Sequence, residues 1–307
     1  MNAHDGRLSF GIKTTPAHIG YDDILRVWQE ADAIPGIEHA WLWDHLLPVF
    51  GPPDGQAHDS WTLLAALAAR TERLRLGLLV TANVLRPPAL LAKIAATTDV
   101  ISRGRLTMGI GVGGTRRTSG GAGGGPGKDP AAEYAALGVG LVSPAEGVAR
   151  LAESCAILRR LWTEDTVDFT GRYYRLTGAR CVPRPERRPP LLIGGSGTRT
   201  LRVVAEHADI WNMPGPPHND AARIRERARI LDGHCAAIGR DPAEITRSAQ
   251  FHVSYDDPAA TRATVLELID AGVTHLVLSL PMPFPPGVAR WAADEIITPV
   301  TERAAAG

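Results

Sequence analysis

Two adjacent residues, Asp44 and His45, offer the clearest acid–base chemistry in the sequence. They follow the apolar run Trp41-Leu42-Trp43, which predicts a buried strand. A carboxylate beside an imidazole provides an acid and a base, and imidazole side chains titrate near neutral pH. The same pair also suits a solvated loop or a local aspartate cap. The pattern therefore predicts a candidate catalytic pair and leaves both interpretations open.

A glycine-rich segment at residues 109–114 matches the pattern G-x-G-x-x-G at the end of a predicted strand. A dinucleotide-binding fingerprint needs a helix that begins at the last glycine, so that its amides face a pyrophosphate. Here residues 115–119 lead instead into the glycine run 120–127, which disfavours any regular element. The pattern therefore favours a strand end that a planar ligand approaches closely, because side chains there would clash with the ligand.

A second glycine cluster, residues 194–197, has the setting that the first cluster lacks. It joins the predicted strand 191–193 to a predicted helix that starts at Thr198. Free amides at a helix N-terminus bind anions, and Ser196 and Thr198 add hydroxyl donors. An ordinary tight turn with a Ser or Thr cap explains the same residues, so a phosphate site and a plain turn remain alternatives.

Polar residues end two other predicted strands. Thr81 and Asn83 follow the third strand, where their side chains suit the amide edge of a ligand, although an Asn in this place also suits a turn. Trp211 and Asn212 end the sixth strand, where they either line a pocket or pack in the core.

The histidines give no support to a metal site, because none of the ten forms the i,i+4 pair of a helical zinc site. We expect His207 and His275 to be structural.

The overall composition argues against several classes of protein. Lys plus Arg and Asp plus Glu both number 33, so no basic excess is present to bind nucleic acid. No apolar run approaches the roughly 18 residues of a membrane span. The polar start of the chain has no signal core, and three widely spaced cysteines fit a reducing compartment. We therefore expect a cytoplasmic protein that acts on a small-molecule substrate.

Strand-like and helix-like segments alternate along the whole chain. The eight predicted strands are residues 8–13, 39–43, 74–81, 106–112, 191–193, 209–212, 248–255 and 275–280. The eight predicted helices are residues 22–33, 59–69, 88–101, 145–162, 198–207, 221–238, 258–271 and 288–303. Most of the strands are apolar runs, as in a parallel sheet that helices cover. This order fits an α/β fold, a (β/α)8 TIM barrel that forms one domain over residues 1–307, with a doubly wound sheet as the alternative.

Two segments interrupt the alternation, residues 113–144 after the fourth strand and residues 164–188 before the fifth. In the second segment, apolar stretches flank Thr170-Gly171-Arg172, which predicts a small β-hairpin. Both insertions occupy positions where a barrel has active-site loops or lids. Together with residues 48–57 they would define the substrate, whose identity the sequence leaves open.

Several motifs in a consistent order make the chain resemble the luciferase-like monooxygenase superfamily, and more narrowly its branch of F-420- or flavin-dependent oxidoreductases. They are LWDHLLP at 42–48, SWTLLAALA at 60–68, LGLLVTAN at 76–83, RPPALLAK at 86–93, ISRGRLTMGIG at 101–111, LRRLWTE at 158–164 and IGGSG at 193–197. Each motif is weak alone, but the set is specific.

The resemblance implies a bacterial-luciferase-like barrel that binds coenzyme F-420, a deazaflavin, or alternatively FMN, at the carboxyl ends of its strands. It implies a cis peptide bond between Leu79 and Val80, a proton-transferring His45, and an Asp44 that hydrogen-bonds the cofactor. The further cofactor contacts that it implies are Leu79, Val80, Thr81 and Asn83 near the ring, Gly111 and Gly113 beneath it, and Gly194, Gly195, Ser196, Gly197 and Thr198 at the phosphate.

The chain departs from the F-420-dependent sugar dehydrogenases of this superfamily at Gly114, where those enzymes have a glutamate. If that acid relays a proton, its loss argues against a sugar-phosphate dehydrogenase. The glycine run 120–127 is also longer than usual, and we expect it to form a mobile lid.

The activity that we expect is hydride transfer between C5 of the deazaflavin and a small organic substrate. One alternative is an FMN-dependent monooxygenase that receives reduced flavin from a separate reductase and reacts with oxygen. Another is a flavin-binding protein without catalysis. The resemblance also implies a homodimer, formed through the helices at residues 59–69 and 88–101.

Overall fold

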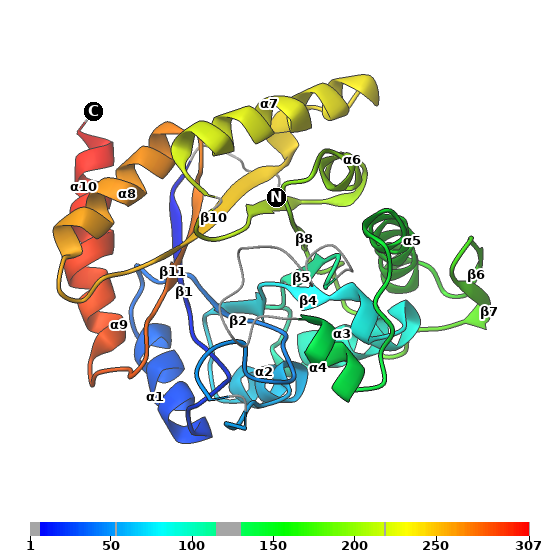
Figure 1. The fold of residues 1–307 in the computed structure, drawn as a ribbon, viewed down its shortest axis with the longest axis horizontal. Coiled ribbons are helices and arrows are strands. Elements are labelled where there is room, and N and C mark those ends of the chain that lie inside the picture. Colours follow the sequence, from blue (N-terminus) through cyan, green and yellow to red (C-terminus); the bar gives the residue numbers. More distant parts are fainter. Residues whose placement is uncertain (1–6, 53, 115–129, 218, 307) are drawn as a thin grey trace.

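A cylinder of parallel strands forms the centre of the computed structural model, which describes residues 7–52, 54–114, 130–217 and 219–306 (Figure 1). Its strand segments, within the described residues, are β1 (Ser9–Lys13), β2 (His39–Leu42), β3 (Arg75–Leu78), β4 (Thr81–Ala82), β5 (Met108–Gly111), β8 (Leu191–Gly194), β9 (Ile210–Met213), β10 (Thr246–His252) and β11 (His275–Ser279). They are hydrogen-bonded in the order β3-β2-β1-β11-β10-β9-β8-β5-β4, and every neighbouring pair is parallel.

The third predicted strand, residues 74–81, is divided into β3 and β4 by the cis peptide bond between Leu79 and Val80. β3 pairs with β2, whereas β4 pairs with β5. A parallel bridge between Leu76 and Leu106 joins β3 to the chain that leads into β5. The predicted (β/α)8 TIM barrel is therefore confirmed, with one of its strands present as two segments.

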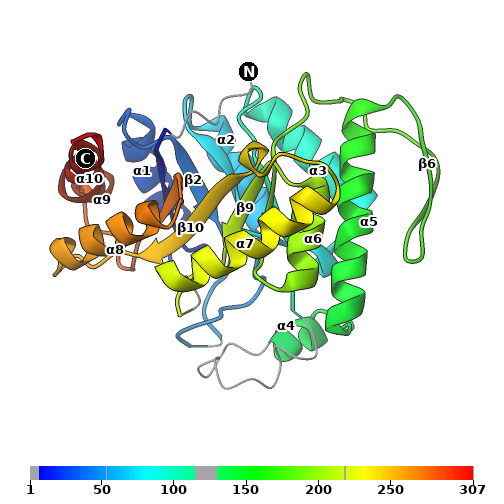
Figure 2. The same ribbon diagram turned by 90° about the horizontal axis from the view of Figure 1, so that it is seen from above.

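Helices follow the strands and cover the outside of the cylinder (Figures 1 and 2). They are α1 (Tyr21–Asp32), α2 (Ser60–Ala69), α3 (Pro88–Ile101), α5 (Pro144–Thr163), α6 (Thr198–His207), α7 (Ala221–Ala237), α8 (Pro258–Asp270), α9 (Val288–Trp291) and α10 (Thr298–Ala305), with single 3-10 turns at Asn83–Leu85 and Pro242–Glu244. The predicted last helix, residues 288–303, contains a π-helical segment, Ala292–Ile297, between α9 and α10. In the chain that the structure describes, no helix combines the length and the apolar character that a membrane span requires.

The two insertions add a short helix and a hairpin. The first contains α4 (Pro130–Ala136), and the second contains β6 (Val167–Thr170) and β7 (Arg175–Ala179). β6 and β7 are antiparallel, which confirms the predicted hairpin, and the hairpin projects beyond α5 (Figure 2). The proposed lid at residues 120–127 lies outside the described residues.

The interior of the barrel is largely apolar, with a few buried polar groups. The strand β11 is buried along its whole length, as expected for a parallel strand that is covered on its outer face. His275 stacks on His39 with ring centroids 3.9 Å apart, and its Nδ1 lies 2.8 Å from Ser248 Oγ. Burial lowers the pKa of His275 to about 4, so the ring is neutral at physiological pH. The structural role predicted for His275 is confirmed.

Candidate functional site

A cavity of about 360 Å³ opens at the carboxyl ends of the strands. Its lining residues are Leu79, Val80, Gly111, Val112, Gly113, Gly194, Gly195, Thr200, Asn212, Pro214 and Gln250. The volume lies within the range of small-molecule and cofactor sites. Six of the residues that the sequence predicts as cofactor contacts line this cavity, namely Leu79, Val80, Gly111, Gly113, Gly194 and Gly195.

Val80 explains why two of these positions are glycine. A Cβ atom on Gly111 would lie 2.7 Å from Val80 Cγ2, and a Cβ atom on Gly194 would lie 3.0 Å from Val80 Cγ1. Both distances are shorter than ordinary van der Waals contacts. The two glycines thus leave room for the Val80 side chain, in addition to any space that they leave for a ligand.

The N-terminus of α6 stands at the wall of the cavity. Its first backbone hydrogen bond runs from Leu201 N to Gly197 O over 2.9 Å, so the amides of residues 198–200 have no acceptor within the helix. No side chain of the described residues caps this end. Thr200, which sequence reasoning missed, lines the cavity together with Gly195. This arrangement suits an anionic group, because free amides and the helix dipole both attract negative charge.

Ser196, Gly197 and Thr198 are adjacent to this wall in the chain, but they are not among the residues that line the cavity. Thr198 O accepts a hydrogen bond from His234 Nε2 at 3.1 Å, and this bond links the first turn of α6 to α7.

Thr81 and Asn83 lie just after the cavity-lining Val80, and both are buried. Neither Thr81 Oγ1 nor the amide oxygen and nitrogen of Asn83 has a hydrogen-bond partner among the described residues. Buried polar atoms normally have partners, so an unpaired hydroxyl and an unpaired amide would be satisfied by a polar ligand placed against them, although neither residue lines the cavity. This observation fits the pyrimidine edge of a flavin or deazaflavin, which presents donors and acceptors side by side.

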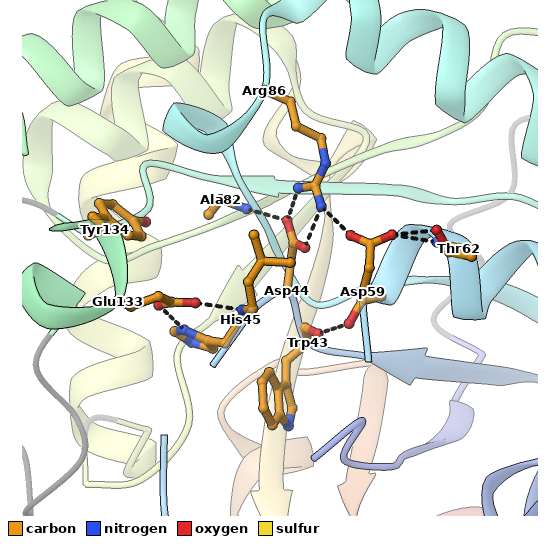
Figure 3. Close-up of polar contacts among 12 residues, drawn as sticks. Trp43, Asp44, His45, Asp59, Thr62, Ala82, Arg86, Glu133 and Tyr134 are labelled. Carbon is orange, nitrogen blue, oxygen red and sulfur yellow. Dashed lines mark hydrogen bonds and ion pairs between the residues drawn. The ribbon is translucent and has the colours of Figure 1, made fainter. Parts of the chain in front are cut away.

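Asp44 is held in a buried ion pair rather than exposed to the cavity (Figure 3). Arg86 donates to both of its oxygens, at 2.7 and 3.1 Å, and Ala82 N donates to Oδ2 at 3.2 Å. Burial raises the pKa of Asp44, and the opposing effect of Arg86 offsets it only in part. The bond to Ala82 ties the end of β2 to β4, so Asp44 positions the strand ends whatever its further contacts are.

Arg86 also contacts a second carboxylate, Asp59 Oδ1, at 2.9 Å. Asp59 is the N-cap of α2, and it accepts a hydrogen bond from Thr62 N at 2.9 Å. Burial would raise the pKa of Asp59, but the hydrogen bonds from Thr62 and the charge of Arg86 outweigh it and lower the pKa. Sequence reasoning missed Arg86, since nothing in its local pattern indicated two acidic partners.

His45 points away from Asp44 and toward the inserted helix α4 (Figure 3). Its Nδ1 lies 2.9 Å from Oε2 of Glu133, whose other oxygen accepts the amide of Leu46 at 2.6 Å and that of Leu47 at 3.4 Å. The His45 side chain is 42% exposed, whereas that of Glu133 is only 5% exposed. His45 therefore combines a buried anionic partner with an open ring, which suits proton transfer. His45 does not line the cavity itself.

Glu133 changes the interpretation of the glycine at position 114. The sequence suggested that an acid was lost at Gly114, but the fold brings a carboxylate to His45 from α4. The next residue, Tyr134, anchors the same helix, because its hydroxyl oxygen accepts the amide of Gly114 at 2.8 Å. Burial raises the pKa of Tyr134 to about 12, so the hydroxyl keeps its proton. The argument against a sugar-phosphate substrate from Gly114 alone loses its basis.

Lys13, at the end of β1, is a further residue that sequence reasoning missed. Its ammonium donates to Oε1 of Gln250, which lines the cavity. Burial lowers the pKa of Lys13 to about 8. Within the described chain, no carboxylate lies within ion-pair distance of this cation. A lysine in a strand of mixed polarity gives no sequence signal that its head group is enclosed.

Of the two residues at the end of β9, Trp211 packs in the core and Asn212 lines the pocket. Trp211 is buried in the core and donates to Gly195 O at 2.8 Å, whereas Asn212 lines the cavity and donates to Ser248 Oγ at 2.8 Å. Among the residues that the structure describes, no three His, Cys, Asp or Glu side chains are grouped in a way that would hold a metal ion.

Comparison with known proteins gives one family for almost the whole chain. The sequence profile of the luciferase-like monooxygenase family matches residues 8–298. An F-420-dependent glucose-6-phosphate dehydrogenase of Amycolatopsis mediterranei is 32% identical over 81% of this chain and 70% of its own. An F-420-dependent hydroxymycolic acid dehydrogenase of Mycobacterium tuberculosis is 29% identical over 81% of this chain and 64% of its own.

The fold is also similar to a solved structure, an F-420-dependent secondary alcohol dehydrogenase in complex with an F-420–acetone adduct. The two superpose with a TM-score of 0.79 over 96% of this chain and 99% of the other, at 17% sequence identity.

Proposed function

The chain belongs to the luciferase-like monooxygenase family, and from this premise we propose that it is an oxidoreductase that uses coenzyme F-420 to interconvert an alcohol and a carbonyl compound. Two relatives of similar identity are named as dehydrogenases that depend on this cofactor, and they act on different substrates. Their names support the cofactor and the reaction class.

The residues around the cavity fit such a cofactor. Thr81 and Asn83 would hydrogen-bond the pyrimidine edge, and the amides at the start of α6 would hold an anionic tail. When bound, the deazaflavin accepts or gives a hydride at C5. His45 takes the proton from the substrate hydroxyl, or returns it to the carbonyl oxygen, and Asp44 ties the ends of β2 and β4 together through its bond from Ala82 N.

The observation that supports the proposal most strongly is the set of unpaired polar atoms on Thr81 and Asn83. They are buried directly after Val80, and Ala82, between them, is bonded to Asp44, the neighbour of His45. A ligand that satisfies these atoms would therefore lie close to the end of β2, where the loop with Asp44 and His45 begins. A flat ring with a polar edge meets that requirement better than an aliphatic substrate does.

Parallel titrations of the purified protein with F-420 and with FMN, followed by fluorescence, test the cofactor. We expect F-420 to bind in the micromolar range and FMN to bind much more weakly. Tight binding of reduced FMN together with oxygen consumption would favour the alternative monooxygenase. Binding of F-420 without turnover of secondary alcohols, ketones or glucose 6-phosphate would favour a carrier without catalysis.

We also propose that the chain forms a homodimer through α2 and α3, as the family resemblance implies. Leu90, Val100 and Ile101, all on α3, are exposed apolar residues and support this face as the interface. Light scattering coupled to size exclusion tests the proposal, because Leu90→Glu should shift a dimer toward the monomer.

A further inference from the structure

The carboxylate of Glu133 has three hydrogen-bond partners, and one of them is His45. Its Oε1 accepts the amides of Leu46 and Leu47, and its Oε2 lies 2.9 Å from His45 Nδ1. All three partners belong to the loop that follows β2. The carboxylate therefore holds the backbone beside the histidine and the imidazole ring at once.

The charge of Glu133 determines the direction of its hydrogen bond to His45. Burial alone would raise the pKa of Glu133, but the contact with His45 and the amides of Leu46 and Leu47 outweigh burial and lower the pKa. The group is therefore ionised at neutral pH, and an ionised carboxylate only accepts hydrogen bonds. It follows that His45 Nδ1 must be the donor.

We propose that Glu133 is a positioning residue that keeps the proton of the neutral His45 ring on Nδ1, and that it thereby leaves Nε2 free to exchange a proton with the substrate. The hydrogen bond that a histidine makes at one ring nitrogen determines which nitrogen carries the proton and which is free to accept one. The choice of tautomer follows from the contact geometry and the ionised state of Glu133, whereas the part of His45 in proton transfer rests on the proposed function.

The proton balance of the reaction fits this assignment. In the oxidation of an alcohol, the O–H bond breaks and its proton goes to Nε2, while the C–H bond breaks with both of its electrons, as a hydride that a deazaflavin held at the cavity would accept. A C=O bond forms, and His45 becomes an imidazolium whose charge Glu133 balances at 2.9 Å. Reduction of the carbonyl compound reverses each of these transfers.

The geometry also supplies a carboxylate for the site although residue 114 is glycine. Gly114 N donates to Tyr134 Oη, and the residue before Tyr134 is Glu133, so the chain at Gly114 helps to dock the helix that provides the acid. The acid thus reaches the histidine from the inserted segment and not from the end of β5.

Nitrogen-15 NMR of the histidine-labelled, cofactor-free full chain tests the tautomer directly, with the His45 signal assigned by its loss in His45→Asn. In the neutral form of the ring, we expect the proton on Nδ1. In Glu133→Gln, the amide oxygen stays on Leu46 N and the NH2 group faces the ring, so we expect the proton to move to Nε2. Glu133→Asp keeps the charge and should keep the proton on Nδ1.

Kinetics with F-420 and a secondary alcohol provide the second readout. We expect Glu133→Gln to lower kcat by about tenfold to hundredfold, with KM within about twofold, because the substrate does not touch residue 133. Glu146→Gln is a matched control, since Glu146 pairs with Arg150 and has no contact with His45. It should leave both the tautomer and kcat unchanged.

A wild-type ring with its proton on Nε2 would overturn the proposal, as would a Glu133→Gln protein with the wild-type tautomer and kcat. If Glu133→Gln does not fold, the wild-type spectrum and Glu133→Asp still decide the matter. If the wild type binds no F-420, the proposed function fails, while the tautomer still tests the role of Glu133.

Discussion

Asp44 and His45 are neighbours in the chain, yet they form two charge pairs of opposite design. In the first pair, both partners are enclosed, with Asp44 fully buried and Arg86 12% exposed at the side chain. In the second pair, the carboxylate of Glu133 is buried but the ring of His45 is open. A pair with two enclosed partners has no route for a proton to a substrate, whereas a pair with one open partner does. The difference separates an enclosed ion pair, which suits a structural role, from an open pair, which suits proton transfer.

The largest effect is expected from Arg86→Met, which leaves Asp44 buried without its cation. Breaking a buried ion pair by removing one partner costs about 3–5 kcal/mol of unfolding free energy. Urea unfolding followed by circular dichroism measures the loss. The control is Arg160→Met, which removes an exposed i,i+4 pair with Glu164 and should lower the free energy of unfolding far less. Equal losses in the two variants would mean that the buried Asp44–Arg86 pair stabilises the protein no more than an exposed pair does.

His45→Asn should show the opposite balance of stability and activity. We expect kcat to fall about a hundredfold, because general acid–base catalysis is lost, while the free energy of unfolding changes by less than about 1 kcal/mol. Steady-state kinetics and urea unfolding of the same preparation check both. His58→Asn, which alters a histidine bonded to Ile19 O, serves as the control and should retain kcat. An unchanged kcat in His45→Asn would remove His45 from the mechanism.

Lys13 sharpens the comparison, because it is an enclosed cation whose observed partner is the neutral Gln250. Its pKa of about 8 in the folded protein lies below the ordinary 10.5 of the unfolded chain. Below pH 8 the folded state therefore bears the full cost of the buried charge, and the cost disappears as the pH rises to 10.5. We expect Lys13→Met to stabilise the protein by about 2 kcal/mol at pH 7, after allowance for the lost hydrogen bond.

Unfolding measured from pH 7 to pH 11 should show the wild type approaching the Lys13→Met variant as the pH increases. A constant difference over this range would contradict the enclosed charge, because it would mean that Lys13 titrates alike in the folded and unfolded states.

The smallest effect on stability is expected from Asp59→Asn, which alters the half-exposed second carboxylate that Arg86 contacts. Asn is also a good N-cap, so the cost at pH 7 should be about 0.5–1 kcal/mol. Because the pKa of Asp59 is lowered by folding, its stabilising contribution is present above the ordinary pKa and is lost as the pH falls through the lowered value. The melting temperatures of the variant and the wild type should therefore differ less at pH 3 than at pH 7. A wider gap at pH 3 would refute this assignment.

The order of strands and helices was predictable because each element has its own local signal. Apolar runs such as Leu191–Gly194 predict buried parallel strands, and Asp59 and Pro88 mark helix starts through capping and ring geometry. The observed bounds of α3 and α6 agree with the predicted ones. The motifs around Asp44 and Gly194 were likewise local, which is why the region of the site was found from sequence.

Only the tertiary structure decided which side chains meet. His45 and Glu133 are 88 residues apart, and Lys13 and Gln250 are 237 apart, so no local spacing connects them. The pairing depends on closure of the barrel and on the docking of α4 at Gly114. Local sequence sets backbone preferences and hydrophobic periodicity, which require only neighbouring residues, whereas burial and the contacts of charged groups depend on the complete fold.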